Sequence, residues 1–306
     1  MERKVIVIVG PTCSGKTTLA IKLALALNSE IISADSRQIY KFLNIGTAKP
    51  SKEELNLVKH YFIDILLPSE DYNVSRFEKE ALRIIEKLFA QNKIPVVAGG
   101  SGLYVKSLVD GIFDVVDTDE EYRKELLEAK AKYGNEFLYE KLKQVDPLSA
   151  QNLLPQNWKR VIRALEVYKL TGRSIVEFQK EFKRETDIKF FQFGLKWPRE
   201  ILYENIEKRV DEMIEAGLID EVKNILSMGY DPGLNSLNTV GYKEIISYLK
   251  NEIDLEEAIR LIKRNTRRYA KRQLTWFGRD NRIKWFSVSN KNRFDEIANE
   301  IIDTVK

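Results

Sequence analysis

The feature of the sequence that most constrains the fold is a glycine-rich octapeptide close to the N-terminus. Residues 10–17 read Gly-Pro-Thr-Cys-Ser-Gly-Lys-Thr, which matches the phosphate-loop pattern Gly-x-x-x-x-Gly-Lys-Ser/Thr. The apolar run Val5–Val9 precedes them, and the helical pattern Thr17–Leu27 follows. Successive backbone N–H groups and the N-terminus of a helix bind anions. The octapeptide therefore predicts a di- or triphosphate site between a strand and a helix, where Lys16 adds a positive charge and the Thr17 hydroxyl ligates a phosphate-bound Mg²⁺.

The first hundred residues alternate short apolar runs with helical patterns. The runs that predict strands are Val5–Val9, Glu30–Ala34, Tyr61–Leu66 and Ile94–Ala98. Ser-x-x-Glu sequences at Ser51 and Ser75 match the capping box and predict helix starts there. Because strands separated by helices form parallel sheets that are covered on both faces, we expect an α/β fold with a P-loop nucleoside-triphosphatase-like sheet.

The character of the chain changes after about residue 114. Four amphipathic helical patterns then follow one another without a strand pattern: Glu120–Tyr133, Phe137–Val145, Trp158–Leu170 and Ser174–Phe182. We therefore expect an all-helical insertion domain over residues 115–186, between core segments 1–114 and 187–306. Later patterns predict strands at Phe190–Lys196 and Ile283–Val288, and a helix with Pro198 at its first position that ends near Ala216 and Gly217.

Composition excludes several classes of protein. The chain has 306 residues, 43% of them hydrophobic and 31% charged, which is typical of a globular protein and not of a disordered one. No apolar run approaches the ~20 residues that span a bilayer, and the N-terminus shows no secretory signal. A single cysteine, Cys13, and a single histidine, His60, exclude an internal disulfide, a cysteine-rich zinc site and a His-pair metal site. We expect a cytoplasmic protein without a membrane partner.

The positive charge of the chain is concentrated near its C-terminus. The net charge is only +4, but residues 260–284 contain ten lysines and arginines, with Asp280 the only acid. Such a stretch is typical of a polyanion-binding surface, and its alternative interpretation is a solvated helix face.

Three polar segments follow predicted strands. They are the phosphate loop, residues 35–40 (Asp-Ser-Arg-Gln-Ile-Tyr) and residues 99–104 (Gly-Gly-Ser-Gly-Leu-Tyr). In open α/β sheets, ligands bind outside the carboxyl ends of the strands, so we expect these segments to meet. A carboxylate beside a bound diphosphate ligates Mg²⁺ or acts as a general base, which makes Asp35 the main candidate. The alternative is that Asp35 only stabilises a turn or a helix N-terminus.

Together these segments resemble the tRNA dimethylallyltransferase family, also called the tRNA isopentenyltransferases or IPP transferases. The matching blocks occur in order from residue 5 to about residue 277, and beside the three segments above they are residues 44–50, 163–167, 240–243 and 270–276. The chain departs from the family at Cys13, where alanine is usual. The resemblance implies transfer of a dimethylallyl group from its diphosphate to N6 of the adenosine 3′ to the anticodon, in tRNAs that read codons beginning with U.

The resemblance also implies the roles of individual residues. Asp35 is the expected general base, with Lys16 and Thr17 as further catalytic residues and Thr17 as the ligand of a Mg²⁺ cofactor. The residues expected to bind the diphosphate are Gly10, Pro11, Thr12, Cys13, Ser14, Gly15, Lys16, Thr17 and Arg209. The residues expected to contact tRNA are Asp35, Ser36, Arg37, Gln38, Ser101, Arg123, Lys159, Arg160, Val161, Ile162, Arg163, Gly241, Tyr242 and Lys243.

The expected partners are dimethylallyl diphosphate and the anticodon stem-loop of tRNA. The helical insertion and the basic stretch 260–284 are the surfaces expected to hold the RNA, and we expect a monomer without an obligate protein partner. Two other classes of function use the same residues. An ATP-dependent small-molecule kinase would use the phosphate loop with Asp35 as the base, and a non-catalytic RNA-binding protein would keep the loop as a relic.

Overall fold

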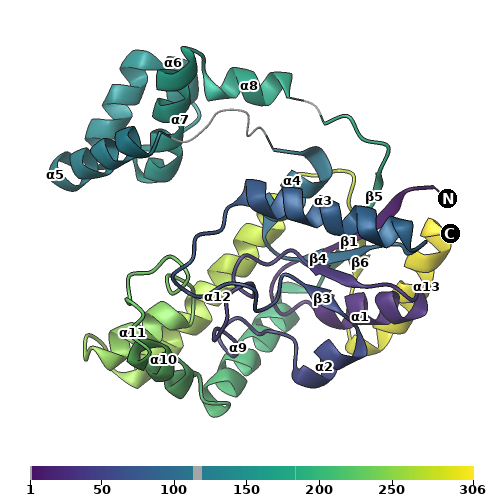
Figure 1. Ribbon diagram of the computed structural model, residues 1–306. Coiled ribbons are helices and arrows are strands. Elements are labelled where there is room, and N and C mark those ends of the chain that lie inside the picture. Colours follow the sequence, from purple (N-terminus) through teal and green to yellow (C-terminus); the bar gives the residue numbers. More distant parts are fainter. Residues whose placement is uncertain (1, 113–118, 183) are drawn as a thin grey trace. The chain divides into compact units, whose positions relative to one another are not determined.

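The computed structural model describes residues 2–112, 119–182 and 184–306 (Figure 1). The chain forms two compact units. One comprises Met1–Val109 together with Thr186–Lys306, and the other comprises Asp110–Glu185. The predicted boundary between residues 114 and 115 lies outside the described residues, whereas the chain returns to the first unit at Thr186.

The first unit is built on a six-stranded sheet in the order β3-β2-β4-β1-β5-β6, and its strand pairs are all parallel. Its strands are β1 (Lys4–Val9), β2 (Ile31–Ser33), β3 (His60–Tyr61), β4 (Val96–Gly99), β5 (Lys189–Lys196) and β6 (Lys284–Ser287). Because β1 pairs with both β4 and β5, the three strands end at the same edge of the sheet. The prediction of an α/β fold with a parallel sheet is confirmed.

Helices cover both faces of this sheet. Alternate residues of β1 point to opposite faces, as the period of a strand requires. Val5 and Val7 belong to a core with α3 (Val74–Ala90), whereas Ile6 and Ile8 pack with α1 (Lys16–Ala26) and α13 (Phe294–Val305). The remaining helices of this unit are α2 (Lys52–Leu57), α4 (Gly102–Asp110), α9 (Arg199–Glu215), α10 (Leu218–Ser227), α11 (Tyr242–Leu249), α12 (Leu255–Phe277) and the short η2 (Lys291–Arg293).

The described residues of the second unit form helices joined by short loops and contain no strand. It contains α5 (Glu120–Val145), α6 (Pro147–Ala150), η1 (Pro155–Asn157), α7 (Trp158–Thr171) and α8 (Ile175–Glu181). Gly134 interrupts α5 with a φ of +83°, which agrees with the two separate helices that the sequence predicts there. Leu126, Leu138 and Leu165 are among the buried residues of its core.

Three local predictions need correction. The side chain that caps α3 is Asn73, which accepts a hydrogen bond from the N–H of Arg76 at 2.8 Å, so the capping box predicted at Ser75 is wrong. The strand predicted over Tyr61–Leu66 ends at Tyr61, because Phe62 and Asp64 adopt positive φ angles of 64° and 54°. Pro198 precedes the first turn of α9, as its ψ of 140° is extended and not helical.

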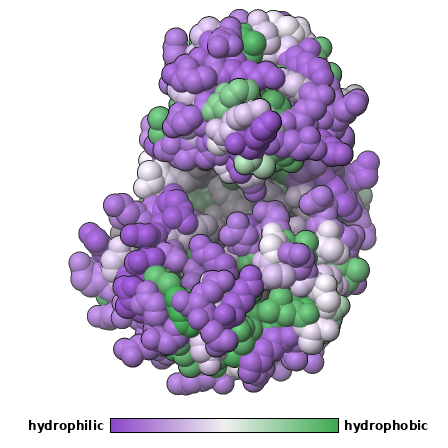
Figure 2. All heavy atoms as spheres, turned by 90° about the vertical axis from the view of Figure 1, so that its left-hand side faces the viewer, coloured by the Kyte–Doolittle hydropathy of each residue, from purple (hydrophilic) through white to green (hydrophobic). Residues whose placement is uncertain are grey.

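One face of the molecule is mainly polar. Figure 2 shows one face on which hydrophilic side chains predominate and apolar side chains lie in separate patches. Among the described residues, no helix is long and apolar enough to cross a membrane.

A carboxylate on α10 holds the loop that follows residue 43. Glu221 accepts hydrogen bonds from the backbone N–H groups of Asn44, Ile45 and Gly46, at 3.0, 2.8 and 3.2 Å, and from the hydroxyl of Tyr242 at 2.6 Å. A Cβ at Gly46 would lie 2.4 Å from the ring of Tyr242, so the loop needs glycine at its point of closest approach. This carboxylate therefore ties α10 and α11 to the segment that begins at Asn44.

We predict that Glu221→Ala lowers the free energy of unfolding by about 2–4 kcal/mol, because it leaves three backbone donors and a buried hydroxyl without their acceptor. Urea denaturation measures this change. Glu212→Ala is the control, since Glu212 is exposed and its ion pair with Lys208 is 3.8 Å long. We expect the control to change stability by less than about 0.5 kcal/mol. A similar small change in both variants would contradict the role of Glu221.

Candidate active site

The phosphate loop occupies the turn between β1 and α1, as predicted. Gly10 and Gly15 have φ angles of +148° and +88°, which side chains rarely adopt. A Cβ at Gly15 would also lie 2.3 Å from the ring of Phe294. Lys16 begins α1, and its Nζ donates a hydrogen bond to the carbonyl oxygen of Pro11 at 2.7 Å. The loop therefore has the backbone conformation and the lysine that phosphate binding requires.

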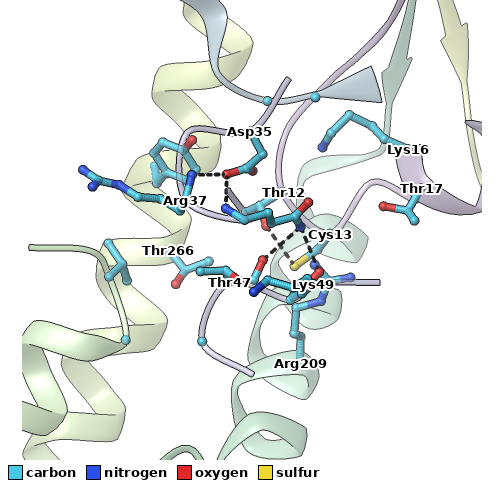
Figure 3. Close-up of a pocket in the computed structure, with 18 of the residues that line it drawn as sticks. Thr12, Cys13, Lys16, Thr17, Asp35, Arg37, Thr47, Lys49, Arg209 and Thr266 are labelled. Atoms are coloured by element: carbon cyan, nitrogen blue, oxygen red, sulfur yellow. Dashed lines mark hydrogen bonds between the residues drawn. The ribbon is translucent and has the colours of Figure 1, made fainter. Parts of the chain in front are cut away.

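A cavity of about 630 Å³ opens beside this loop. Figure 3 shows Lys16 and Thr17 from the start of α1, Asp35 from the segment after β2, and Arg209 from α9 around it. Six lysine and arginine side chains line the described part of the cavity, against two carboxylates. The cations are Lys16, Arg37, Lys49, Arg209, Lys243 and Arg272, and the carboxylates are those of Asp35 and Glu54. The charge of the cavity favours an anionic ligand.

The charge on Lys16 depends on its surroundings. Burial and the nearby guanidinium of Arg209 lower the pKa of Lys16 to about 8, although the carboxylate of Asp35 acts in the opposite direction. An anion in the cavity would favour the protonated form, because an opposite charge nearby stabilises an ammonium group. Lys16 and Arg209 together therefore prepare the site for a group with several negative charges.

Asp35 lies where the carboxyl end of β2 meets the cavity. Its Oδ1 accepts hydrogen bonds from the backbone N–H groups of Arg37 at 2.8 Å and Gln38 at 3.4 Å, and both are drawn in Figure 3. These bonds hold the carboxylate in one orientation, so Asp35 does stabilise a turn. It also lines the cavity. Asp35 therefore stabilises the turn and lies where a base or a metal ligand is needed, and its chemical role stays a prediction.

Most of the residues predicted to bind the diphosphate line the cavity. They are Thr12, Cys13, Ser14, Gly15, Lys16, Thr17 and Arg209. Gly10 and Pro11 are buried and do not line it. At Gly10 a Cβ would lie 3.0 Å from the carbonyl oxygen of Leu195, so this glycine allows the loop to cross β5 closely. Gly10 therefore shapes the loop, and a direct role of Gly10 and Pro11 in binding stays a prediction.

The donors for a metal ion are few. Among the described residues, no three His, Cys, Asp or Glu side chains are close enough to hold a metal ion together. Thr17 and Asp35 both line the cavity and both carry oxygen atoms, the ligand that Mg²⁺ prefers. Mg²⁺ commonly binds through one or two protein oxygens and the phosphates of a substrate, and these two residues fit that pattern.

The residues predicted to contact tRNA in the first unit line the same cavity with two exceptions, Ser101 and Tyr242. Ser36, Arg37, Gln38, Gly241 and Lys243 line it. The hydroxyl of Ser101 accepts a hydrogen bond from the N–H of Ser36 at 3.0 Å, which joins two of the predicted segments. Tyr242 is fully buried and its hydroxyl bonds to Glu221, so a contact of this residue with tRNA would have to involve its backbone.

The second unit gathers two of its predicted contact residues around a buried carboxylate. Glu166 has no exposed surface, and its Oε2 lies 2.8 Å from Nη2 of Arg123 and 3.6 Å from Nη1 of Arg163. Lys159 and Arg160 are exposed. Val161 and Ile162 are only 0% and 4% exposed and belong to the core of this unit. Their side chains pack inside this unit, so a contact of these two residues with tRNA would have to involve their backbone.

The structure also places residues at the cavity to which sequence reasoning gave no role. The Lys49 side chain is 4% exposed, and its Nζ bonds to the carbonyl oxygen of Tyr40 at 2.9 Å and to Asn44 Oδ1 at 2.8 Å. Tyr269 and Gln273 reach the cavity from α12, and burial raises the pKa of the Tyr269 hydroxyl. Lys49 and Gln273 lie in segments that match the family, which was the only signal available for them.

The basic stretch 260–284 divides into paired and unpaired cations. Arg260, Lys263, Arg267, Arg282 and Lys284 form ion pairs with carboxylates. Four other cations lie together with Thr275 and Trp276 around an open groove of about 450 Å³, without a carboxylate partner among the described residues. They are Arg268, Lys271, Arg272 and Arg279. This unpaired face, together with the 39% exposed Trp276, has the chemistry of a nucleic-acid surface.

Comparisons with known proteins agree on one family. A family model described as IPP transferase matches residues 38–280. The chain is similar to a protein named tRNA dimethylallyltransferase from Alkaliphilus oremlandii (strain OhILAs), with 48% identity over 310 residues that cover 100% of this chain and 98% of the relative. A protein of the same name from Halothermothrix orenii is also 48% identical, over 97% of this chain and 90% of its own.

Solved structures show the same similarity. The full-length tRNA isopentenylpyrophosphate transferase from Bacillus halodurans matches with a TM-score of 0.73 and 41% identity, covering 100% of this chain and 97% of its own. A eukaryotic dimethylallyltransferase described as acting on tRNA matches with a TM-score of 0.81 and 30% identity, covering 99% of this chain and 80% of its own.

The pKa of Lys16 predicts how binding of a diphosphate depends on pH. Since the ligand favours the protonated lysine, affinity is full below pH 8 and is lost as the pH rises through 8, the pKa of the free protein. We expect the Kd for dimethylallyl diphosphate, measured by calorimetry, to rise about tenfold between pH 7 and pH 9. The thermal midpoint, measured at both pH values, controls for unfolding. A constant Kd across this range would contradict the electrostatic role of Lys16.

Proposed function

This chain belongs to the IPP transferase family, and from that premise we propose that it transfers a dimethylallyl group from dimethylallyl diphosphate to N6 of an adenosine in tRNA. The observation that carries the proposal is that one cavity contains both the residues suited to bind a diphosphate and a carboxylate suited to act as a base. The phosphate loop and Arg209 suit a diphosphate leaving group, and Asp35 lies in the same cavity as a base for the acceptor.

The proposed reaction is a substitution at the first carbon of the prenyl group. The bond between this carbon and the diphosphate oxygen breaks, and a bond from N6 of adenine to the same carbon forms. The diphosphate leaves with the bonding electrons, and Lys16, Arg209 and the N-terminus of α1 stabilise its charge. Mg²⁺ held by Thr17 and the phosphates would neutralise part of the same charge.

Asp35 is the proposed acceptor of the N6 proton. The lone pair of an adenine amine is delocalised into the ring, so the amine attacks poorly unless its proton is removed. The two backbone hydrogen bonds to Oδ1 keep the carboxylate oriented, so it needs little rearrangement before it takes the proton. The proton then passes to solvent and the carboxylate is regenerated.

The RNA-binding part of the proposal rests on the distribution of charge. The unpaired face of Arg268, Lys271, Arg272 and Arg279 suits a phosphate backbone, and Trp276 suits an unpaired base. On the second unit, exposed Lys159 and Arg160 and the two arginines bonded to Glu166 supply further cations. We propose the anticodon stem-loop as the bound element, with the modified adenosine 3′ to the anticodon, because a base in a loop can be turned out into a cavity.

The experiment that tests the function uses the full chain with Mg²⁺, unmodified tRNA and labelled dimethylallyl diphosphate. The tRNA is digested, and mass spectrometry identifies the modified nucleoside and its position. We expect a prenylated adenosine 3′ to the anticodon in tRNAs that read codons beginning with U, and no turnover of ATP in a parallel reaction without the prenyl donor. Consumption of ATP without prenyl transfer would contradict the proposal and favour a kinase.

We predict that Asp35→Asn lowers kcat by about 100-fold or more, because general base catalysis contributes on that scale. Asparagine keeps an oxygen that can accept the hydrogen bonds from Arg37 and Gln38, so the turn should persist. We expect the Kd for tRNA, measured by filter binding, to change less than threefold. An equal loss of binding and rate would show that Asp35 supports structure and does not accept the proton.

A further inference from the structure

Gln273 is a buried polar residue that lies next to the phosphate loop and has no part in the reaction described above. It lies in α12 and is 5% exposed. Its Oε1 accepts a hydrogen bond from the backbone N–H of Thr12 at 2.8 Å, and its Nε2 donates one to the carbonyl oxygen of Gly100 at 2.9 Å. One amide thus joins the phosphate loop to the segment that follows β4.

The chemistry of these two bonds requires a primary amide. One end of the side chain must accept and the other must donate, which glutamine does and a glutamate carboxylate cannot. The fit is also close, because a Cβ at Gly100 would lie 2.1 Å from Nε2 of Gln273. A side chain at position 100 would therefore displace the amide of Gln273, which lies against the backbone of Gly100.

The segment that Gln273 holds leads directly to the proposed base. The N–H of Ser101 donates to the carbonyl oxygen of Ala34 at 3.2 Å, and the Ser101 hydroxyl accepts from the N–H of Ser36. Asp35 lies between these two bonded residues in the chain. The phosphate loop is therefore linked to the segment that carries Asp35 through a continuous set of hydrogen bonds, and Gln273 is the link from α12.

We propose that Gln273 is a positioning residue that sets the distance and orientation between the diphosphate-binding loop and the segment of the base. This inference rests on the proposed function and deepens it. In-line substitution needs the leaving group, the reacting carbon and the attacking amine to be aligned, and small displacements between the two sides are costly. Gln273 contributes by holding Thr12 and Gly100 in register, without contact with the reacting atoms.

The test compares Gln273→Glu and Gln273→Met with a matched control, Gln192→Met. Gln192 is equally buried at 5% exposed, lies in β5 and does not line the cavity. We expect both Gln273 variants to raise the Kd for dimethylallyl diphosphate about tenfold, because they lose one or two hydrogen bonds that hold the loop in its binding conformation. We expect kcat to fall by a similar factor. The Kd for tRNA should change less than threefold, and Gln192→Met should change none of these.

An unchanged Kd for dimethylallyl diphosphate in the Gln273 variants would overturn the inference. An equal rise of this Kd in Gln192→Met would also overturn it, because the effect would then come from the loss of any buried amide. Amide hydrogen exchange of the wild-type protein provides a test that needs no variant. The Thr12 N–H should be protected in the ligand-free protein, and rapid exchange at that position would also overturn the inference. Calorimetry and hydrogen exchange need no turnover, so they test the role of Gln273 independently of the reaction. Failure of the proposed function would instead appear as the absence of prenyl transfer by the wild-type protein.

Discussion

The position of β1 between β4 and β5 is the constraint on which the rest of this structure depends. Val9 lies opposite Gly99 on one side and Gly194 on the other, so β1 and β4 end at one level and β5 continues to Lys196. The phosphate loop continues from Val9. β4 also pairs with β2, and Ser33 at the end of β2 lies opposite Ala98. This pairing fixes the position of the segment that begins after Ser33 and carries Asp35. Parallel pairing therefore brings together turns that are far apart in the sequence, and the cavity forms where they meet.

The electrostatics of the cavity follow from this convergence. Separate elements each contribute a cation to the cavity. Burial and the guanidinium of Arg209 destabilise the protonated form of Lys16 and lower its pKa. The excess of cations in the cavity stabilises a diphosphate. Asp35 contributes a single negative charge that its backbone hydrogen bonds hold in one orientation, so the cavity can bind an anion and still present a base.

Buried and half-buried polar groups keep the surrounding segments in place. Glu221 holds the loop that begins at Asn44, Glu166 holds two arginines of the second unit, and Gln273 holds the phosphate loop against Gly100. Buried carboxylates and amides need partners, because an unsatisfied polar atom in the interior is costly. For Glu221 and Gln273 those partners are backbone groups of segments around the cavity, so stability and site geometry depend on the same contacts.

The sequence by itself determined the phosphate loop, the alternation of strands and helices and the helical nature of the second unit, because each depends on residues close together in the chain. It could not determine which residue caps α3, since Ser75 and Asn73 offer similar patterns and side-chain geometry decides between them. Tertiary structure alone decided that Val161 and Tyr242 face cores, and that Gln273 reaches Thr12. Contacts between distant segments leave no periodic pattern in a single sequence, so only the folded chain shows them.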